Sequence, residues 1–453
     1  FYFKLDGIDI PSLKGTYVDC FNELKADILF NHAWEKKDTE MFNYDDKEDL
    51  TYVVNALRKA NRPIFAVGNG VRFSDTVDIL RKIGEHTKIP ITTVWNSHDI
   101  IPNNHVSYCG RFGADGERAG NFAVQNADLL VILGARMHIR QVGFNHSSFA
   151  RAAEKIMIDV DPIEMEKPTL NINKKIKCNL KDLMPRLERA LGIYEFKQEH
   201  SDYNDWCKEK VRRFPVLLER HKSSSQTSHV NPYFFIDELF KKIPDQCNVV
   251  TSDGTAAVVT FKVAEISEQH RVFTNKGCAS MGFELPAVVG AFFADPKKML
   301  VCIAGDGSIM MNMQELQTIK HHCIPVKIFL LNNGGYHSIR QSQQNYFDGF
   351  SVGCGIESGL SFPDFQKLSH CFGFTYQRIS SVVNLSDDIE RSLKTKGAVL
   401  TEIIIDKDQL FEPGIASKKL ANGDLVSNPL EDMSPLLTRK QLADEMIIDV
   451  WQD

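Results

Sequence analysis

The residues best suited to chemistry are Gly305-Asp306-Gly307-Ser308 and Asn333, each of which follows an apolar segment. Glycines let the backbone turn tightly and approach a ligand closely, and a helix that begins there points free N–H groups at an anion. Asp306 supplies a hard carboxylate oxygen of the kind that binds Mg²⁺ bridging phosphates. The 27 residues between Asp306 and Asn333 suit one strand–helix–strand crossover, which would return Asn333 to the same sheet edge. The pattern predicts a site for a metal-bound diphosphate.

Two stretches of the chain alternate strand-like and helix-like segments, which would position those residues. The strand-like segments are 64–67, 89–94, 129–133 and 156–160 in the first stretch, and one near 249, 299–304, 326–331 and 399–405 in the second. The segment 309–322, between two of the later strands, has a helical pattern of apolar residues. This alternation predicts an α/β protein with two consecutive doubly wound domains, each built on a parallel sheet.

The same pattern gives the predicted domain boundaries. They are a short irregular extension at 1–47, a central α/β domain at 48–195, a linker at 196–228, a second α/β domain at 229–410 and a tail at 411–453. The linker is assigned because residues 196–228 are polar and rich in Lys, Glu and Ser.

The composition argues against several classes of protein. A net charge of −6 gives no reason to expect a nucleic-acid partner or an anionic membrane surface. We find no apolar run long enough to span a bilayer. Ten scattered cysteines with no Cys-x-x-Cys pair fit free thiols better than a disulfide scaffold or structural zinc. We therefore predict a cytoplasmic enzyme.

The arrangement around Asp306 resembles the metal–diphosphate signature of the thiamine-diphosphate enzymes, in which a GDG sequence is followed by NN one crossover later. The resemblance implies that Asp306, Asn333 and the carbonyl of Gly335 hold Mg²⁺, and that thiamine diphosphate is the cofactor. Ser252-Asp-Gly254-Thr255 lies where the family places diphosphate contacts, and a plain turn is the alternative for that segment. The implied cofactor-binding residues of these two segments are Gly254, Thr255, Gly305, Asp306, Gly307, Ser308 and Asn333.

A second segment sharpens the resemblance. Residues 275–286 read NKGCASMGFELP and are similar to the GTMGFGLP segment of the acetolactate synthase and pyruvate oxidase group. The resemblance implies that Met281 bends the cofactor into a V shape and that the backbone of Ala279 and Met281 binds its aminopyrimidine. Taken alone, Met281 would be read as core filler, but its position shortly before Asp306 favours the wedge.

The central stretch also resembles that group, through residues 61–72 (NRPIFAVGNGVR) and 158–167 (IDVDPIEMEK). The resemblance covers roughly residues 48–435. A competing interpretation takes Gly68-Asn-Gly70 as a dinucleotide fingerprint, but Phe73 stands where the third glycine would be.

Two segments depart from the acetolactate synthase pattern. Residues 134–142 read GARMHIRQV where those enzymes usually carry GxRFDDR, which weakens FAD as a further candidate cofactor. Residues 335–341 read GYHSIRQ and look more like acetolactate synthase-like enzymes that move an acetyl unit onto a keto sugar in surface-polysaccharide pathways. His337, Arg340 and Gln341 are therefore candidate substrate-facing residues, with a solvated helix start as the alternative.

The resemblance implies a carboligase that decarboxylates a 2-keto acid such as pyruvate and transfers the acyl unit to a second carbonyl, as a homo-oligomer or with a partner chain. In the family, an amino-terminal domain supplies the Glu that activates the cofactor. Only about 47 residues precede the central domain here, and Glu23, Glu35 and Glu40 match no such segment, so we assign no catalytic residue. A truncated product, a split enzyme completed by another chain and a non-catalytic relic remain open.

Overall fold

The computed structural model of the protein describes residues 47–193, 195, 197–222, 229–347, 349–419 and 425–452. The predicted extension, with Glu23, Glu35 and Glu40, lies outside the described residues except for Lys47. The chain divides into two units, Phe1–Leu50 and Thr51–Asp453. Helix α3 (Lys47–Lys59) begins in the first unit, and all strands described below belong to the second.

The first sheet is parallel and has the strand order β3-β2-β1-β4-β5-β6. Its strands are β1 (Pro63–Val67), β2 (Ile91–Thr93), β3 (Tyr108–Arg111), β4 (Leu129–Leu133), β5 (Glu154–Asp159) and β6 (Lys174–Lys177). Its helices are α4 (Gly70–Phe73), α5 (Val77–Thr87), α6 (Arg118–Gln125), α7 (Ile139–Val142), α8 (Leu180–Leu191) and α9 (Gln198–Arg213), with 3₁₀ turns at Trp95–Ser97, His146–Ser148 and Glu164–Glu166. The short helix α10 (Glu219–Lys222) packs instead on α11 (Pro232–Lys242), which belongs to the second sheet. Helices α6 and α9 bury one face of the sheet, through residues such as Ala123 and Tyr203.

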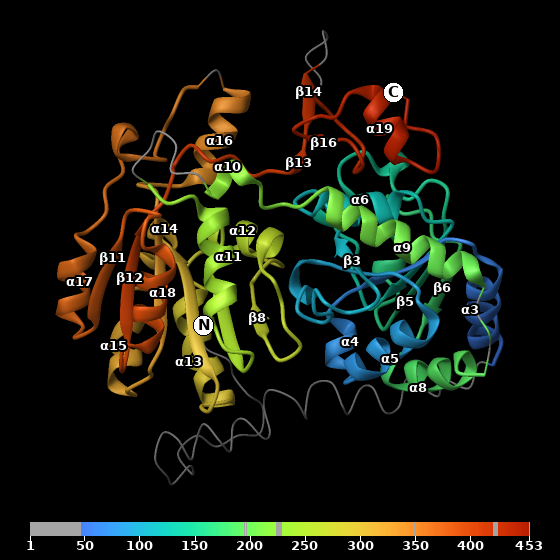
Figure 1. Ribbon diagram of the computed structural model, residues 1–453, viewed down its shortest axis with the longest axis horizontal. Coiled ribbons are helices and arrows are strands. Elements are labelled where there is room, and N and C mark those ends of the chain that lie inside the picture. The colour runs from blue at the N-terminus through green and yellow to red at the C-terminus, as the bar shows by residue number, and fades with distance from the viewer. Residues whose placement is uncertain are drawn as a thin grey trace. The chain divides into compact units, whose positions relative to one another are not determined.

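The second sheet is also parallel, in the order β11-β12-β10-β9-β7-β8 (Figure 1). Its strands are β7 (Cys247–Thr251), β8 (Arg271–Phe273), β9 (Met299–Gly305), β10 (Lys327–Asn332), β11 (Thr375–Ile379) and β12 (Val399–Ile404). Its helices are α11 (Pro232–Lys242), α12 (Thr255–Val263), α13 (Glu284–Ala294), α14 (Asp306–Ile309), α15 (Glu315–His321), α16 (His337–Tyr346), α17 (Phe365–Cys371) and α18 (Leu385–Lys394), with a 3₁₀ turn at Ile356–Ser358. The prediction of two consecutive parallel-sheet α/β folds is confirmed.

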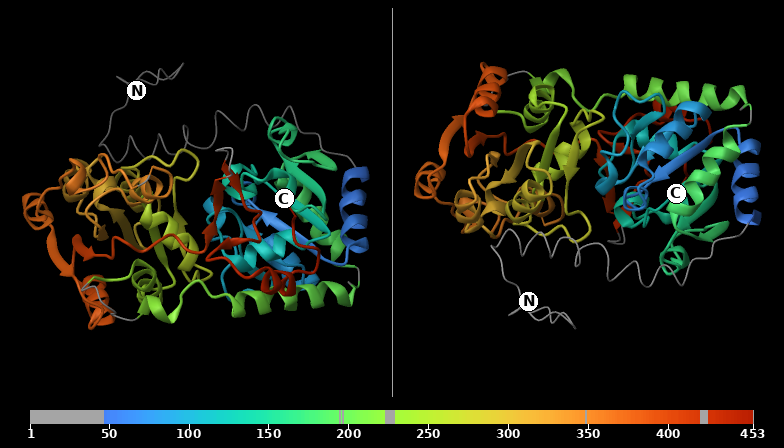
Figure 2. Two further views of the ribbon diagram at one scale, coloured as in Figure 1. Left: turned by 90° about the horizontal axis from the view of Figure 1, so that it is seen from above. Right: turned by 90° about the horizontal axis from the view of Figure 1, so that it is seen from below.

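Strand β9 lies inside this sheet and sends side chains to both faces. Val301 and Ile303 pack with α11, α12 and α18, whereas Cys302 and Ala304 pack with α13, α15 and α17. Helices therefore cover both faces, as the turned views also show (Figure 2). Because both faces are buried, β9 is apolar throughout and is held rigidly up to its carboxyl end at Gly305.

The prediction of one helix over residues 309–322 was wrong. The segment is divided into α14, a single turn that starts at Asp306, and α15, with turns between them. Asn312, in those turns, donates its side-chain amide to the carbonyl of Gly282 at 2.9 Å, a contact with a distant segment. The single turn after Asp306 also provides far less of a helix dipole than the predicted helix would.

The last part of the chain forms small antiparallel pairs and a helix: β13 (Gly414–Ile415), β14 (Ser417–Lys419), β15 (Leu425–Ser427), β16 (Met433–Ser434) and α19 (Arg439–Glu445). It packs on the first sheet's helices, where Asn121 Nδ2 donates to the carbonyl of Leu430 at 3.0 Å and Lys210 pairs with Glu445 at 2.5 Å. The predicted domain boundaries stay predictions. No helix within the described part of the chain is long and apolar enough to cross a membrane.

Candidate functional site

Asp306 occupies the carboxyl end of β9 and binds the loop that follows the neighbouring strand β10. Its Oδ2 accepts hydrogen bonds from the main-chain N–H groups of Asn333 and Gly335, both at 3.1 Å, and its Oδ1 accepts one from Gly307 at 2.7 Å. The side chain is buried, and burial raises the pKa of Asp306 to about 6 although these N–H groups oppose the rise. The carboxylate therefore joins the two predicted metal-binding segments.

The loop after β10 is fixed by close backbone contacts. A Cβ on Gly335 would stand 1.9 Å from the carbonyl oxygen of Cys354, and one on Gly307 would stand 2.2 Å from the ring of Tyr336. Only glycine fits at either position. The side-chain oxygen Oδ1 of Asn333 is buried and has no hydrogen-bond partner among the described residues. An acceptor left without a donor in this position is suited to a cation.

The turn before α12 borders the same sheet edge, because β7 lies beside β9. Ser252, at the end of β7, accepts a hydrogen bond on Oγ from the N–H of Gly305 at 3.1 Å. Gly254 has φ +64 and leads into the N-terminus of α12, where the hydroxyl of Thr255 is buried without a described partner. The first turn of α12 thus offers free N–H groups and a hydroxyl to an anion held at this edge.

Met281 lies on a backbone that is tied to the Asp306 segment. The N–H of Gly282 donates to Ser308 Oγ at 2.9 Å, and Gly282, with φ +84, leaves no room for a Cβ beside Met311. Ala279 has φ +53, an uncommon conformation for a residue with a side chain. Met281 itself is 38% exposed, which favours the wedge over the core-filler alternative.

Comparisons with known proteins agree with this geometry. The central domain of thiamine pyrophosphate enzymes matches residues 50–187, and their C-terminal TPP binding domain matches residues 253–403. The acetolactate synthase large subunit of Cyanidium caldarium is 30% identical over 418 residues, which cover 91% of this chain and 68% of that protein. The acetolactate synthase isozyme 2 large subunit of Escherichia coli (strain K12) is 29% identical over 420 residues, covering 91% of this chain and 70% of that protein. This chain belongs to the thiamine pyrophosphate enzymes and is acetolactate synthase-like.

Membership of the thiamine pyrophosphate enzymes raises the question of whether the residues fit a metal-bound thiamine diphosphate. No group of three or more His, Cys, Asp and Glu side chains that could hold a metal occurs among the described residues. The predicted metal site does not require such a group, because its donors are the carboxylate of Asp306, the free amide oxygen of Asn333 and the main-chain carbonyl of Gly335. The residues fit, since Mg²⁺ accepts a small number of protein oxygens and takes others from phosphates.

The candidate substrate residues of this thiamine pyrophosphate enzyme lie at the start of α16 and differ in how far they are buried. His337 is buried, its Nδ1 lies 3.1 Å from the carbonyl of Lys407, and burial lowers the pKa of its ring. Arg340 is also buried, whereas Gln341 is half-buried. Ser338 and Ile339, which the sequence did not single out, are exposed. The accessible face of the helix start is therefore formed by Ser338, Ile339 and Gln341.

The glycines of the alternative dinucleotide fingerprint have a packing role. A Cβ on Gly68 would stand 2.1 Å from the carbonyl oxygen of Gly134, and one on Gly70 would stand 2.7 Å from the Cα of Gly134. The loops after β1 and β4 therefore touch, which accounts for both glycines without a nucleotide. Nearby, Arg136 and Lys167 form ion pairs with Glu164. FAD binding in the central domain stays a prediction.

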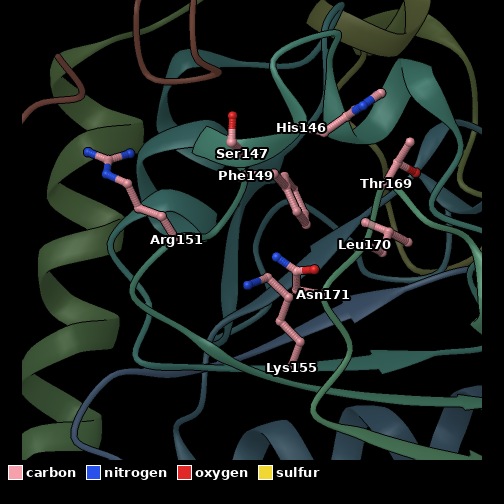
Figure 3. A pocket seen from close by; sticks show the side chains of 8 residues that line it. All are labelled: His146, Ser147, Phe149, Arg151, Lys155, Thr169, Leu170 and Asn171. Atoms are coloured by element: carbon pink, nitrogen blue, oxygen red, sulfur yellow. The ribbon is translucent and has the colours of Figure 1, made fainter. Parts of the chain in front are cut away.

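A small cavity in the central domain contains none of the predicted site residues (Figure 3). It is lined by His146, Ser147, Phe149, Arg151, Lys155, Thr169, Leu170 and Asn171. These residues precede β5 and β6, except for Lys155 near the start of β5, so the cavity lies at the amino ends of these strands, whereas α/β enzymes bind ligands at the carboxyl ends.

The sequence interpretation also overlooked Glu284, which accepts a hydrogen bond from the hydroxyl of Ser308 at 2.9 Å. A signal was present, because Glu284 stands where the similar GTMGFGLP segment has its last glycine. The hydroxyl of Ser308 therefore donates within the protein, to Glu284.

Proposed function

We propose that this protein is a thiamine-diphosphate- and Mg²⁺-dependent carboligase that decarboxylates a 2-keto acid such as pyruvate and transfers the acyl unit to a second carbonyl. The observation that carries the proposal is the buried side-chain oxygen of Asn333, which no described donor contacts, on a residue whose main-chain N–H donates to the carboxylate of Asp306. The two relatives described above are acetolactate synthase large subunits, which supports this chemistry.

The chain's own residues would bind and orient the cofactor. Asp306, Asn333 and the carbonyl of Gly335 would hold the Mg²⁺ ion, and the first turn of α12 with Thr255 would bind the diphosphate. Met281 would support the bend between the two rings, while the main chain of Ala279 and Met281 would bind the aminopyrimidine. When bound, thiamine diphosphate supplies the carbon chemistry of decarboxylation and acyl transfer. The protein's contribution is to hold that group in one geometry and limit its contact with water.

The acceptor carbonyl is the open part of the proposal. A keto sugar is the second candidate, because the GYHSIRQ segment resembles enzymes that act on such acceptors. Exposed Ser338 and half-buried Gln341 border the accessible side of α16 and offer hydrogen-bonding groups to sugar hydroxyls. We further propose a cytoplasmic assembly, either a homo-oligomer or a complex with another chain, since the relatives are named as large subunits.

The experiment is calorimetric titration of the full chain with thiamine diphosphate, with and without Mg²⁺, followed by turnover of pyruvate alone and with a keto-sugar acceptor. Metal-dependent binding with acetolactate as product supports the synthase activity, whereas product only with the keto sugar supports the second candidate. Binding without turnover in any mixture would favour the non-catalytic alternative. Absence of binding would contradict the proposed function.

A further inference from the structure

Glu284 is a buried acid that the proposed function does not use. It is the first residue of α13, immediately after the Met281 segment, and its side chain is 0% exposed. The similar GTMGFGLP segment has glycine at this position, so a full-length acidic side chain occupies space that a glycine would leave empty. Burying a carboxyl group is costly unless its oxygens receive hydrogen bonds or protons.

The contacts of Glu284 join two parts of the predicted cofactor site. Ser308 Oγ donates to Glu284 Oε2 at 2.9 Å, and the same Oγ accepts from the N–H of Gly282 at 2.9 Å. Asn312 then donates to the carbonyl of Gly282. Because the hydroxyl of Ser308 donates to Glu284, a lone pair of its oxygen is left to accept from Gly282. The backbone beside Met281 is thereby fixed to the segment that carries Asp306.

The environment of Glu284 favours the neutral acid. Its second oxygen, Oε1, is buried without a described partner. The titratable groups that face the carboxyl are Asp253, after β7, and Cys302, on β9, and neither supplies a positive charge. Lys276 lies nearby but pairs with Asp253 at 2.9 Å. Burial raises the pKa of Glu284 from its ordinary 4.5 to about 7, although the main-chain N–H groups of Glu284 and Gly282 and the bond from Ser308 oppose the rise.

We propose that Glu284 is a positioning residue that acts as a neutral acid in the cofactor-bound protein, holding Ser308 and the Met281 backbone in the binding conformation. The inference rests on the proposed function, since it concerns the diphosphate expected beside Ser308. A diphosphate brings negative charge next to a carboxyl that has no cation of its own. Binding would therefore retain the proton on Glu284, and ionisation of Glu284 would oppose binding.

The test is calorimetric titration of the full chain with Mg²⁺–thiamine diphosphate at pH 6, 7 and 8. Three variants are compared with the wild type. Glu284→Gln keeps an acceptor for Ser308 but cannot ionise, Glu284→Gly restores the residue of the similar segment, and Glu315→Gln makes the same change at the start of the neighbouring helix α15. Titration of the cofactor's own phosphates affects all proteins equally, so the ratio of dissociation constants between each variant and the wild type is the measured quantity.

We expect wild-type affinity to fall about tenfold between pH 6 and 8 relative to Glu284→Gln, because a group with a pKa of about 7 loses its proton over this range. Glu315→Gln should follow the wild type. Glu284→Gly should bind more weakly than Glu284→Gln at pH 6, since it lacks the acceptor for Ser308. Identical pH profiles for the wild type and Glu284→Gln would overturn the inference and leave the proposed function standing. Failure of the wild type to bind at every pH would overturn both.

Discussion

The Asp306 carboxylate accepts a hydrogen bond from the main-chain N–H of Asn333 at 3.1 Å. The two residues are 27 positions apart, yet this bond holds the Asn333 loop against the end of β9 without any ligand. The buried amide oxygen of Asn333 then remains free beside the carboxylate. The protein itself therefore holds the main chain of Asn333 at the predicted Mg²⁺ site, which limits the backbone ordering that a bound ion would require.

Replacing Gly335 with alanine should disrupt the metal site. Its Cβ would meet the Cys354 carbonyl oxygen at 1.9 Å, so the loop would have to move and release the N–H that binds Asp306. We expect Mg²⁺-dependent binding of thiamine diphosphate to weaken at least tenfold by calorimetry, or about 1.4 kcal/mol. Gly290→Ala is the control, because Gly290 lies in α13 with nothing within 4 Å of an added Cβ. Equal affinity in both variants would contradict the role of this loop.

Met281→Ala distinguishes a cofactor support from core filler. Because Met281 is 38% exposed, its truncation should lower the free energy of unfolding by less than about 1 kcal/mol. Cofactor affinity or turnover should fall. Met157→Ala, at a fully buried position in β5, should instead cost about 2–5 kcal/mol. Urea unfolding of the two variants makes the comparison, and a large loss of stability in Met281→Ala with unchanged cofactor binding would favour the core-filler interpretation.

The interior strands could be predicted from the sequence, and the edge strands could not. Strands β9 and β4, for example, each have a neighbouring strand on both sides, and their sequences are continuous apolar runs. The four strands that the sequence did not indicate, β3, β6, β8 and β11, are the two edges of each sheet. Strands β6 and β11 bury only part of their residues, so they carry no such run. Which strand lies at an edge depends on the order of strands in the sheet, and the local sequence pattern does not specify that order.

The candidate site divides in a similar way. Gly305 to Ser308 and Asn333 follow directly from short motifs at the ends of apolar strands, and the structure brings these segments together through Asp306. The break after Ile309 and the bond between Ser308 and Glu284 depend on contacts across the fold, which periodicity cannot reveal. The roles assigned to these residues stay predictions until a ligand is bound.

His98 should make stability fall in mild acid. The ring is fully buried, and burial lowers the pKa of His98 from 6.5 to about 3, with nearby Arg111 lowering it further and Asp99 opposing. The unfolded chain therefore takes up a proton below pH 6.5 that the folded chain does not. The contribution of neutral His98 to the free energy of unfolding is fully present above pH 6.5 and is lost as the pH falls toward 3.

In His98→Phe, the slope of unfolding free energy against pH between 6.5 and 4.5 should decrease by up to about 1.4 kcal/mol per pH unit. Phenylalanine keeps a ring for stacking on Phe261, whose centroid lies 5.6 Å from that of His98. Urea unfolding at several pH values measures the slope. An unchanged slope would show that His98 does not remain neutral in the folded protein.

Asp99 should be important for stability, because it joins Arg72 beside the first sheet to Arg271 at the start of β8. Its oxygens lie 2.7 Å from Arg72 Nη2 and 2.6 Å from Arg271 Nη1, and the carboxylate is 0% exposed. Asp99→Ala leaves two partly buried cations without their partner, so we expect a loss of about 3–5 kcal/mol. Glu219→Ala removes an exposed pair with Lys222 and should cost less than about 1 kcal/mol. Similar losses in the two variants would contradict this assignment.

The most direct test of the central claim compares the wild type with Asp306→Ala in calorimetric titrations with thiamine diphosphate, each with and without Mg²⁺. Asp306 is predicted to supply the carboxylate that binds the metal, and it also holds the Asn333 loop. The account predicts Mg²⁺-dependent binding by the wild type and none that depends on Mg²⁺ in Asp306→Ala. Tight metal-dependent binding retained by a folded Asp306→Ala protein would contradict it.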